Sequence, residues 1–294
     1  MNLLKTIQDC AQAHGCAAGV CDASPLDAGY AQKNAFVPFV RQDMTKRINP
    51  SAVLAGAQSM VAVAVPAGAP VPCGNDGGQG GPMAQLSSIG ANHDYHPRVK
   101  AVLNAIVSAL AQHMSFKHKI LVDSPTLDER AFAQRAGLGF IGRSGLLISP
   151  QWGTWFNIGL LLLDIPIPAD FPNGPTTSGC PPACRRCIDA CPNGALQPAG
   201  GLDAYKCISY LTQKKGWTGQ EGAMFHGQLF GCDICQNVCP FNKAPRPTTQ
   251  VNPQQWLDMS DADFAEKYGH TAMLWQGAAL LRRNAQAAID YGNH

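Results

Sequence analysis

The chain has 294 residues, of which 46% are hydrophobic and only 14% charged, so it is long enough for two domains and too apolar for a disordered protein. Its formal net charge of +2 is too small to indicate nucleic-acid binding without a local basic patch. The N-terminal stretch has no long apolar core, and no apolar run approaches the roughly 20 residues of a membrane span. Twelve cysteines without an export signal indicate a reducing cytoplasm, where thiols remain available to bind metal.

The N-terminal part alternates helical and strand patterns. Residues 3–11 carry apolar side chains at helical spacing and are followed by Gly15, which predicts a helix that ends before this glycine. Residues 17–21 and 59–65 are short apolar runs, and the second is β-branched and closed by Pro66. Both runs are therefore predicted to be buried strands.

Two further segments lie near these strands. Residues 22–25 are predicted to form a turn, and the chain from there through Phe39 is predicted to be helical. The glycine-rich segment 74–81 could in principle hold a phosphate, but it lacks the Lys-Ser/Thr of a P-loop. We therefore interpret it as a surface loop.

The middle of the chain contains the clearest helical pattern. Apolar residues at helical spacing run through 97–114, with Asp94 placed to cap the helix and Pro97 near its first turn. Residues 120–122 then predict a strand, and residues 127–136 predict a second helix.

Residues 137–142 match the dinucleotide-binding pattern G-x-G-x-x-G, with Asp164 at a suitable distance downstream. That pattern requires a strand before it and a helix after it, whereas here a predicted helix precedes and the strand-like residues 146–148 follow. Tight turns are therefore the favoured interpretation, and nicotinamide binding is the alternative. Residues 156–165 predict another buried strand, and residues 166–179, rich in proline and glycine, predict a linker.

The end of the chain is predicted to be helical. Residues 261–268 and 278–291 both have helical apolar spacing. Ser260 and Asp263 match a capping box in which Asp replaces the usual Glu.

Eight of the twelve cysteines fall between residues 180 and 240, in two groups that each end in Cys-Pro. Closely spaced cysteines can wrap a 4Fe–4S cluster, and in two-cluster ferredoxins the Cys before Pro ligates the other cluster. The spacing therefore predicts two clusters that exchange one ligand each. The predicted ligands of cluster 1 are Cys180, Cys184, Cys187 and Cys239, and those of cluster 2 are Cys191, Cys207, Cys232 and Cys235.

Structural zinc and disulfides are the alternatives for these cysteines. The first gap has three residues instead of two, and Cys207 stands apart from the others. Zinc also accepts four-cysteine sites, but the Cys-Pro endings favour clusters. Disulfides are disfavoured because nothing in the sequence indicates secretion.

Several motifs occur in an order that resembles the epoxyqueuosine reductase family, and the resemblance covers nearly the whole chain. It implies an α+β fold: a nitroreductase-like cobalamin-binding domain over residues 1–175, a ferredoxin-like domain with two 4Fe–4S clusters over 176–245, and a C-terminal helical segment over 246–294 that corresponds to truncated HEAT-like repeats. The residues that carry the resemblance, apart from the cysteines, are 47–66, 94–96, 122–125, 129–142, 146–148, 153–155, 207–212 and 283–285.

The resemblance also implies a reaction. Cobalamin would be bound base-off, and a flavodoxin- or ferredoxin-type carrier would send electrons through the clusters to cobalt. The epoxide of epoxyqueuosine at the wobble position of tRNA would then be reduced to the alkene of queuosine. We expect a cytoplasmic monomer that does not contact a membrane. No Asp-x-His-x-x-Gly sequence is present to supply an imidazole ligand to cobalt.

From its position before Ser-Pro alone, Asp123 is better explained as a turn residue, but the resemblance implies that it is the family's proton donor. An acid is needed to protonate the departing epoxide oxygen, and burial would raise the pKa of a carboxyl enough for that task. The resemblance implies cobalamin contacts at Arg47, Ser209 and Asp233. For residues 94–96 a helix cap and a place near the substrate pocket remain equal alternatives.

The chain departs from the family pattern at Arg143 and ends soon after residue 285, so we expect tRNA to be held by fewer basic residues. The remaining basic pairs are Arg185–Arg186, Lys214–Lys215 and Arg282–Arg283. Two other functions stay open: a reductive dehalogenase-like enzyme, and an iron–sulfur electron-transfer or corrinoid-reducing protein. The sequence assigns no role to Cys10, Cys16, Cys21 or Cys73.

Overall fold

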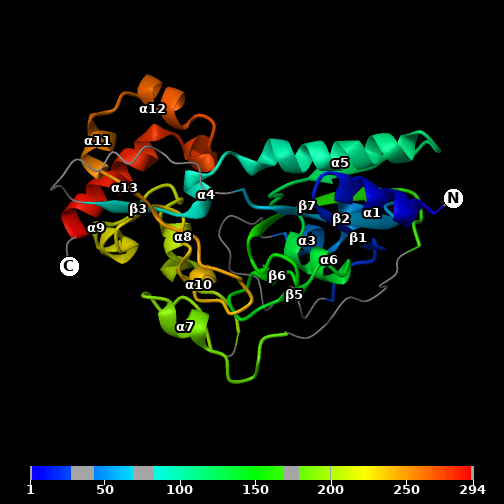
Figure 1. Ribbon diagram of the computed structural model, residues 1–294, viewed down its shortest axis with the longest axis horizontal. Coiled ribbons are helices and arrows are strands. Elements are labelled where there is room, and N and C mark those ends of the chain that lie inside the picture. The colour runs from blue at the N-terminus through cyan, green and yellow to red at the C-terminus, as the bar shows by residue number, and fades with distance from the viewer. Residues whose placement is uncertain (1, 28–42, 69–82, 169–178, 199, 293–294) are drawn as a thin grey trace.

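The computed structural model describes residues 2–27, 43–68, 83–168, 179–198 and 200–292. Two halves lie side by side, one built on a four-stranded sheet and one that carries the cysteine-rich segment and the C-terminal helices (Figure 1). The 74–81 loop, Cys73 and most of the predicted helix through Phe39 lie outside the described residues. The chain combines an antiparallel sheet with helices that pack on it, which confirms the predicted α+β class.

The four-stranded sheet has the order β1-β2-β7-β4, and each neighbouring pair is antiparallel. These four strands confirm the strand predictions, although β4 begins two residues before the predicted start and does not include Val122. The bounds are β1 Ala17–Asp22, β2 Ser59–Pro66, β7 Phe156–Leu163 and β4 His118–Leu121.

Helices cover both faces of this sheet. The alternating side chains of β2 separate the two cores: Val61, Val63 and Val65 pack with α1 (Leu3–Ala13) and α5 (Tyr95–Ala111). Met60, Ala62 and Ala64 pack with α6 (Glu129–Arg135), because successive residues of a strand point to opposite faces. The small side chains on the second face allow α6 to approach closely. At Gly19 a Cβ would lie 1.9 Å from the carbonyl oxygen of Ala136.

The glycine-rich segment after α6 forms turns, as predicted. Within it, β5 (Phe140–Ile141) pairs with β6 (Leu147–Ile148) in a hairpin, so a helix precedes the segment and a strand follows it. A Cβ at Gly139 would lie 2.1 Å from the carbonyl oxygen of Ile148, which explains this glycine by close packing of the backbone. Asp164 accepts a hydrogen bond from the backbone N–H of Lys117 at 2.7 Å. Dinucleotide binding requires a strand before this segment and a helix after it, and the structure has the reverse order. The nicotinamide alternative is therefore wrong.

The second half contains a three-stranded sheet that the sequence patterns did not indicate. β3 (Ala84–Leu86) pairs in parallel with β8 (Gln228–Phe230) and antiparallel with β9 (Thr249–Val251). Its apolar residues pack with Trp256, Phe264 and other C-terminal side chains. The sheet thus crosses the domain boundaries predicted at residues 175 and 245, and those boundaries remain a prediction.

The other elements of this half are short. The predicted C-terminal helices are confirmed, and so is the capping box, in which Ser260 N–H donates to Asp263 at 3.1 Å and Asp263 N–H donates to Ser260 Oγ at 3.2 Å. Within the described ranges, no helix is both long and apolar enough to cross a bilayer. The remaining helices are α3 Met44–Ile48, α4 Ser88–Ala91, α7 Arg186–Ala190, α8 Ile208–Leu211, α9 Gly219–Gly222, α10 Ile234–Asn237, α11 Pro253–Asp258, α12 Asp261–Tyr268 and α13 Ala278–Tyr291.

Asn284 of α13 connects the C-terminal helices to the cysteine-rich segment through hydrogen bonds. Its side chain is fully buried and donates hydrogen bonds to the carbonyl oxygens of Thr212 and Leu229, each at 2.7 Å. Its amide oxygen accepts from the Arg283 guanidinium at 2.7 Å. Because a buried amide is costly unless all its polar atoms are paired, this arrangement fixes α13 in one position.

Candidate active site and cluster centres

Asp123 follows β4 at the edge of the sheet, in a backbone conformation that is rare for residues other than glycine. Its φ is 50°, and among the described residues the other non-glycine residue with positive φ is His226. Asp and Asn tolerate this left-handed region better than most residues do, but at some cost in free energy. Strained residues held in place by their surroundings gather at functional sites, so this conformation favours a functional role over a simple turn.

Two neighbouring residues contact the Asp123 carboxyl. The hydroxyl of Tyr95 donates a hydrogen bond to its Oδ2, and His96 Nε2 lies 3.6 Å from the same atom. The other ring nitrogen of His96 lies 2.7 Å from Asp94 Oδ1, which also accepts the backbone N–H of His96 at 3.0 Å. Asp94 therefore caps α5, which confirms the helix-cap alternative, and it also belongs to the Asp123 network. A place near the substrate pocket stays a prediction.

The surroundings raise the pKa of Asp123 to about 6, first because protein atoms displace water around the carboxyl and second because the Asp94 carboxylate repels a second negative charge. The side chain is nevertheless 56% exposed, since one side of it is open. The packing around the carboxyl and the negative charge of Asp94 both act to raise this pKa.

A second carboxyl, Glu129 at the start of α6, was not indicated by the sequence. Burial is the main reason why its pKa is raised to about 8, and the nearby charge of Asp123 contributes. Its Oε1 accepts the backbone N–H of Ser124 at 2.8 Å, so it braces the loop that carries Asp123. In sequence it resembles an ordinary acidic residue in the first turn of a helix.

Arg47, a predicted cobalamin contact, is buried and bonded to another residue. Its Nη2 donates to Asp128 Oδ2 at 2.9 Å, and the two side chains are 4% and 3% exposed. Asp128 also caps α6 by accepting the backbone N–H of Ala131 at 3.3 Å. The pair ties α3 to α6, and the cobalamin contact of Arg47 stays a prediction.

We expect Arg47→Met to lower the melting temperature of the anaerobically purified protein strongly, because it leaves the Asp128 carboxylate buried without a partner. Breaking such a pair costs about 3 to 5 kcal/mol, and each kcal/mol shifts the melting temperature of a protein this size by about 2 to 4 °C. The double variant Arg47→Met/Asp128→Asn keeps the helix cap and removes the charge, so it should recover much of the loss. No recovery in a thermal melt would contradict the ion-pair role.

The other two predicted cobalamin contacts lie near the cysteines. Asp233 accepts the backbone N–H of Ser88 at 2.5 Å and the side-chain amide of Gln236 at 3.0 Å, and burial raises its pKa. The Ser209 hydroxyl accepts from Gln213 Nε2 at 3.2 Å. Both side chains thus have local partners, and their contacts with cobalamin remain predictions.

The eleven described cysteines are all free, and the cysteines of the predicted cluster 1 interact with one another. Burial raises the pKa of the Cys239 thiol, and Cys180 and Cys184 raise it further through their charge. The pKa of Cys187 is raised by burial and by the same two residues. These four side chains line one small cavity together with the β5–β6 turn, where Arg143 also lies.

The cysteines of the predicted cluster 2 form a second interacting group. Burial raises the pKa of Cys232 to about 12, and the charges of Cys207 and Cys191 act in the same direction. The pKa of Cys235 is raised by burial and by Cys232, Cys207, Cys187 and Cys191. The two groups agree with the predicted exchange of Cys239 and Cys191, although no three such side chains in the described part of the chain converge as they would around a single metal ion.

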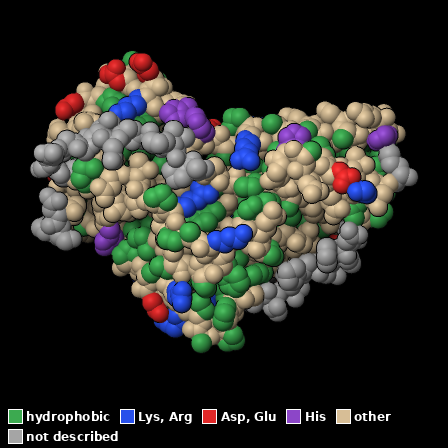
Figure 2. Space-filling model, in the orientation of Figure 1, with side chains coloured by type: hydrophobic (Ala, Val, Ile, Leu, Met, Phe, Trp, Pro, Cys, Tyr) green, Lys and Arg blue, Asp and Glu red, His purple; other side chains and the backbone are tan. Residues whose placement is uncertain are grey.

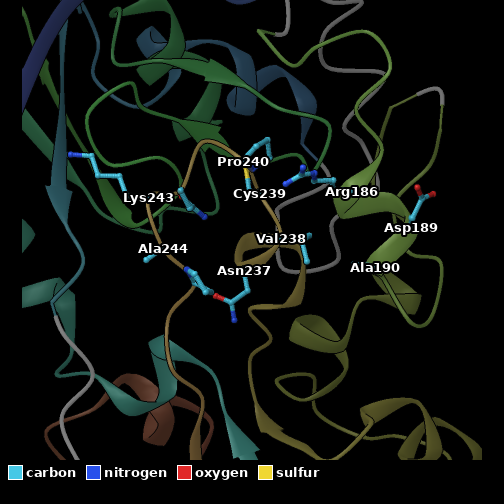
Figure 3. A pocket seen from close by; sticks show the side chains of 11 residues that line it. Arg186, Asp189, Ala190, Asn237, Val238, Cys239, Pro240, Lys243 and Ala244 are labelled. Atoms are coloured by element: carbon cyan, nitrogen blue, oxygen red, sulfur yellow. The ribbon is translucent and has the colours of Figure 1, made fainter.

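A groove of about 760 Å³ runs beside cluster 1. Figure 3 shows Arg186 and Asp189 of α7 on one side of it and Asn237 and Lys243 on the other, with Cys239 between them. Cys239, a predicted ligand of cluster 1, therefore lines a groove that is open to the surface.

The two halves are joined at the residues that follow Cys239. The Asn242 side chain accepts the backbone N–H of Thr154 at 2.8 Å and donates to Thr154 Oγ1 at 3.0 Å. Gly153 has a φ of 60°, and a Cβ there would lie 2.0 Å from Asn242 Oδ1. The glycine therefore permits the close approach that fixes cluster 1 relative to the sheet.

Two buried polar atoms between the halves have no hydrogen-bond partner in the described structure: Asn92 Oδ1 and Trp155 Nε1. Asn92 Nδ2 donates to Gly68 O at 3.3 Å, and Arg246 donates to the same oxygen at 2.6 Å while its guanidinium lies 4.7 Å from the Trp155 ring centroid. Unpaired buried polar atoms are rare in proteins, and these two offer a donor and an acceptor to a bound group. The sequence did not identify Asn92, since nothing in its local pattern indicates burial.

Comparison with known proteins agrees with this layout. Residues 47–124 match the family model for epoxyqueuosine reductase QueG, DUF1730, and residues 180–242 match that for a 4Fe-4S double cluster binding domain. The chain is 34% identical over 269 residues to the epoxyqueuosine reductase of Bacillus cereus, covering 86% of this chain and 69% of the relative. The Staphylococcus aureus reductase is also 34% identical, over 278 residues that cover 87% and 69% of the two chains.

Solved structures give the same grouping. An epoxyqueuosine reductase in complex with an epoxyqueuosine-modified tRNA-Tyr stem loop matches with a TM-score of 0.85 and 28% identity, over 98% of this chain and 81% of that chain. The Streptococcus thermophilus reductase has a TM-score of 0.85 and 27% identity, over 99% and 82%. The reductive dehalogenase NpRdhA shares the fold, with a TM-score of 0.52 and 16% identity over 97% and 37%.

Proposed function

Because the chain belongs to the epoxyqueuosine reductase family, we propose that it reduces epoxyqueuosine to queuosine in tRNA, with cobalamin and two 4Fe–4S clusters as cofactors. The family identities above support the reaction, and the tRNA stem loop bound by the similar solved structure supports the substrate. Reduction of an epoxide to an alkene consumes two electrons and two protons and releases water. The chain must therefore supply an electron path and an acid.

The residues present fit both cofactors. The two groups of interacting cysteines supply four thiolates for each cluster. Cobalamin carries many amide groups, and the unpaired Asn92 Oδ1 and Trp155 Nε1 offer an acceptor and a donor to such groups. When bound, cobalamin supplies a low-valent cobalt centre that can reduce a carbon of the epoxide.

Asp123 is the residue we assign as the acid that protonates the departing oxygen. Its pKa of about 6 leaves a useful fraction of the carboxyl protonated near neutral pH. Tyr95 and His96 orient it by contacts with Oδ2, and the bond between Glu129 and Ser124 N–H holds its loop. These three residues position the acid and need not react themselves.

The observation that carries the proposal is this protonatable carboxyl, held in a strained conformation within a chain that also has a double-cluster domain. The experiment is complementation of cells that lack their own epoxyqueuosine reductase, followed by analysis of tRNA nucleosides. We expect queuosine to replace epoxyqueuosine. Persistence of epoxyqueuosine despite a loaded, folded protein would refute the proposed substrate.

We expect Asp94→Asn to move the pH dependence of turnover to lower pH. The Asp94 charge helps to raise the pKa of Asp123, so its removal lowers that pKa. The protonated acid is the active form, and activity is therefore lost as pH rises through a lower value than in the parent protein. Asparagine is also a good N-cap, so α5 should be preserved. An unchanged pH profile of single-turnover rates would show that Asp94 does not act on Asp123.

A further inference from the structure

The two predicted clusters differ in their access to the surface. Both described cavities in the cysteine-rich half are lined by cluster 1 cysteines, and Cys239 lines both. Residues 181–183 and Pro240, beside cluster 1, are exposed. The cysteines of cluster 2 line neither cavity. Electrons from outside would therefore enter through cluster 1.

The surface around cluster 1 is basic. Two of the segments that line the cavities beside cluster 1, residues 143–148 and 237–245, contain no Asp or Glu. Arg186 and Lys243 are exposed and have no ion-pair partner among the described residues, while Asp189 is paired with Arg185 at 3.0 Å. Figure 2 shows Lys and Arg side chains in a band that runs down to α7, whereas most acidic side chains on this face gather near α12.

The other two basic pairs contain side chains that contact other residues of this chain. Arg282 forms an ion pair with Asp261 at 2.6 Å, and Lys214 pairs with Glu221. Arg283 donates to the carbonyl oxygen of Lys214 at 2.7 Å and lies over Trp217. Of the three pairs noted in the sequence, Arg185–Arg186 is therefore the one whose two side chains are both exposed.

We propose that the groove beside cluster 1, with Arg186, Lys243 and Arg143 around it, is the docking surface for a small acidic one-electron carrier protein. This inference rests on the proposed function, which requires an external electron donor. Transient electron-transfer complexes have small interfaces, and complementary charge brings the partners together quickly. The basic rim supplies that charge, and Cys239 lies at the floor of the contact.

The apolar surface at the same place favours a protein partner over a nucleic acid. Phe241 is 36% exposed and packs edge-on against Phe140 with ring centroids 5.2 Å apart, next to the exposed Pro240. An apolar centre within a charged rim is typical of protein interfaces, whereas nucleic-acid surfaces are more uniformly cationic. Binding of tRNA to this surface is thus the alternative that the experiment must exclude.

The test uses the full chain with its clusters and an acidic flavodoxin as the probe. We expect Arg186→Glu/Lys243→Glu to slow reduction of the clusters by reduced flavodoxin about 10-fold or more at about 0.01 M salt, where electrostatic steering contributes 10- to 1000-fold. The direct affinity for flavodoxin should fall as well. The difference from the parent protein should shrink at about 1 M salt, where charges are screened beyond about 3 Å.

The matched control is Lys117→Glu/Lys119→Glu, which changes the net charge equally but lies at the exposed edge of the four-stranded sheet. It should be reduced at the parent rate, and dithionite should reduce all three proteins alike. Unchanged flavodoxin affinity in the Arg186/Lys243 variant, or a loss of tRNA affinity in place of flavodoxin affinity, would overturn the proposal. Because binding and reduction are measured without turnover, failure of the proposed reaction would leave this result unaffected.

Discussion

Asp123→Asn is expected to lower turnover by about 10² to 10⁴-fold while both clusters and cobalamin stay bound. That range is the usual contribution of a positioned general acid. The carboxyl with a pKa of about 6 can deliver a proton near neutral pH, and the amide that replaces it cannot. Turnover is measured by single-turnover formation of queuosine on epoxyqueuosine-modified tRNA, beside iron and cobalt content.

Asparagine is the informative substitution because Asp123 has a φ of 50°. Asn adopts the left-handed region as readily as Asp, so the loop should keep its shape. Asp123→Ala would add strain of about 1 to 2 kcal/mol and would also open space, which mixes two effects. A control at the other left-handed residue, His226→Asn, should leave turnover unchanged. Near-parental activity of the Asn variant would mean that Asp123 is structural.

The cluster segment could be predicted from the sequence because its information is local. Cysteine spacing and the Cys-Pro endings restrict which thiolates can meet. In the structure Cys239 interacts with Cys180 and Cys184, and Cys232 interacts with Cys207 and Cys191, while the ligand sets themselves stay a prediction. The long helix from Tyr95 was equally predictable from its apolar period, and the strands Ser59–Pro66 and Phe156–Leu163 were predictable from their continuous apolar runs.

The small sheet of β3, β8 and β9 could not be predicted, because each strand has only three residues and too few side chains to show a period. These strands exist because distant segments bring apolar residues such as Leu86 and Phe230 into one core with the C-terminal helices. Their pairing is a consequence of tertiary packing.

The candidate site illustrates the same limit. Sequence indicated Asp123 only through family resemblance, and its local pattern was that of a turn. Asp123 is distinguished by its positive φ and by its contacts with Tyr95 and His96. These two partners lie 28 and 27 positions earlier in the chain. The environment of Arg47 was also not predictable: this predicted cobalamin contact is buried against Asp128, 81 positions later in the chain. Neither environment is encoded in neighbouring residues.

If the clusters exchange one ligand each, replacing Cys239 or Cys191 should damage the cluster whose other ligands lie further away in the sequence. Cys239 lies four residues after Cys235, yet the thiols that interact with it in the structure are those of Cys180 and Cys184. Cys191 follows Cys187 closely, yet it interacts with Cys207 and Cys232. A cluster missing one thiolate is expected to lose iron or degrade, while the other keeps its four ligands.

We therefore expect the parent protein to contain about eight irons per chain and Cys239→Ser to approach about four, with loss of cluster 1. Three variants decide which cluster is lost: the electron paramagnetic resonance spectrum of reduced Cys239→Ser should match that of Cys184→Ser and differ from that of Cys235→Ser. Cys10→Ser, on α1, should keep the parental iron content. If the spectrum of Cys239→Ser instead matched that of Cys235→Ser, each cluster would be held by cysteines adjacent in sequence, and the exchange would be wrong. Loss of turnover should accompany loss of cluster 1, because that cluster is the surface-accessible end of the electron path.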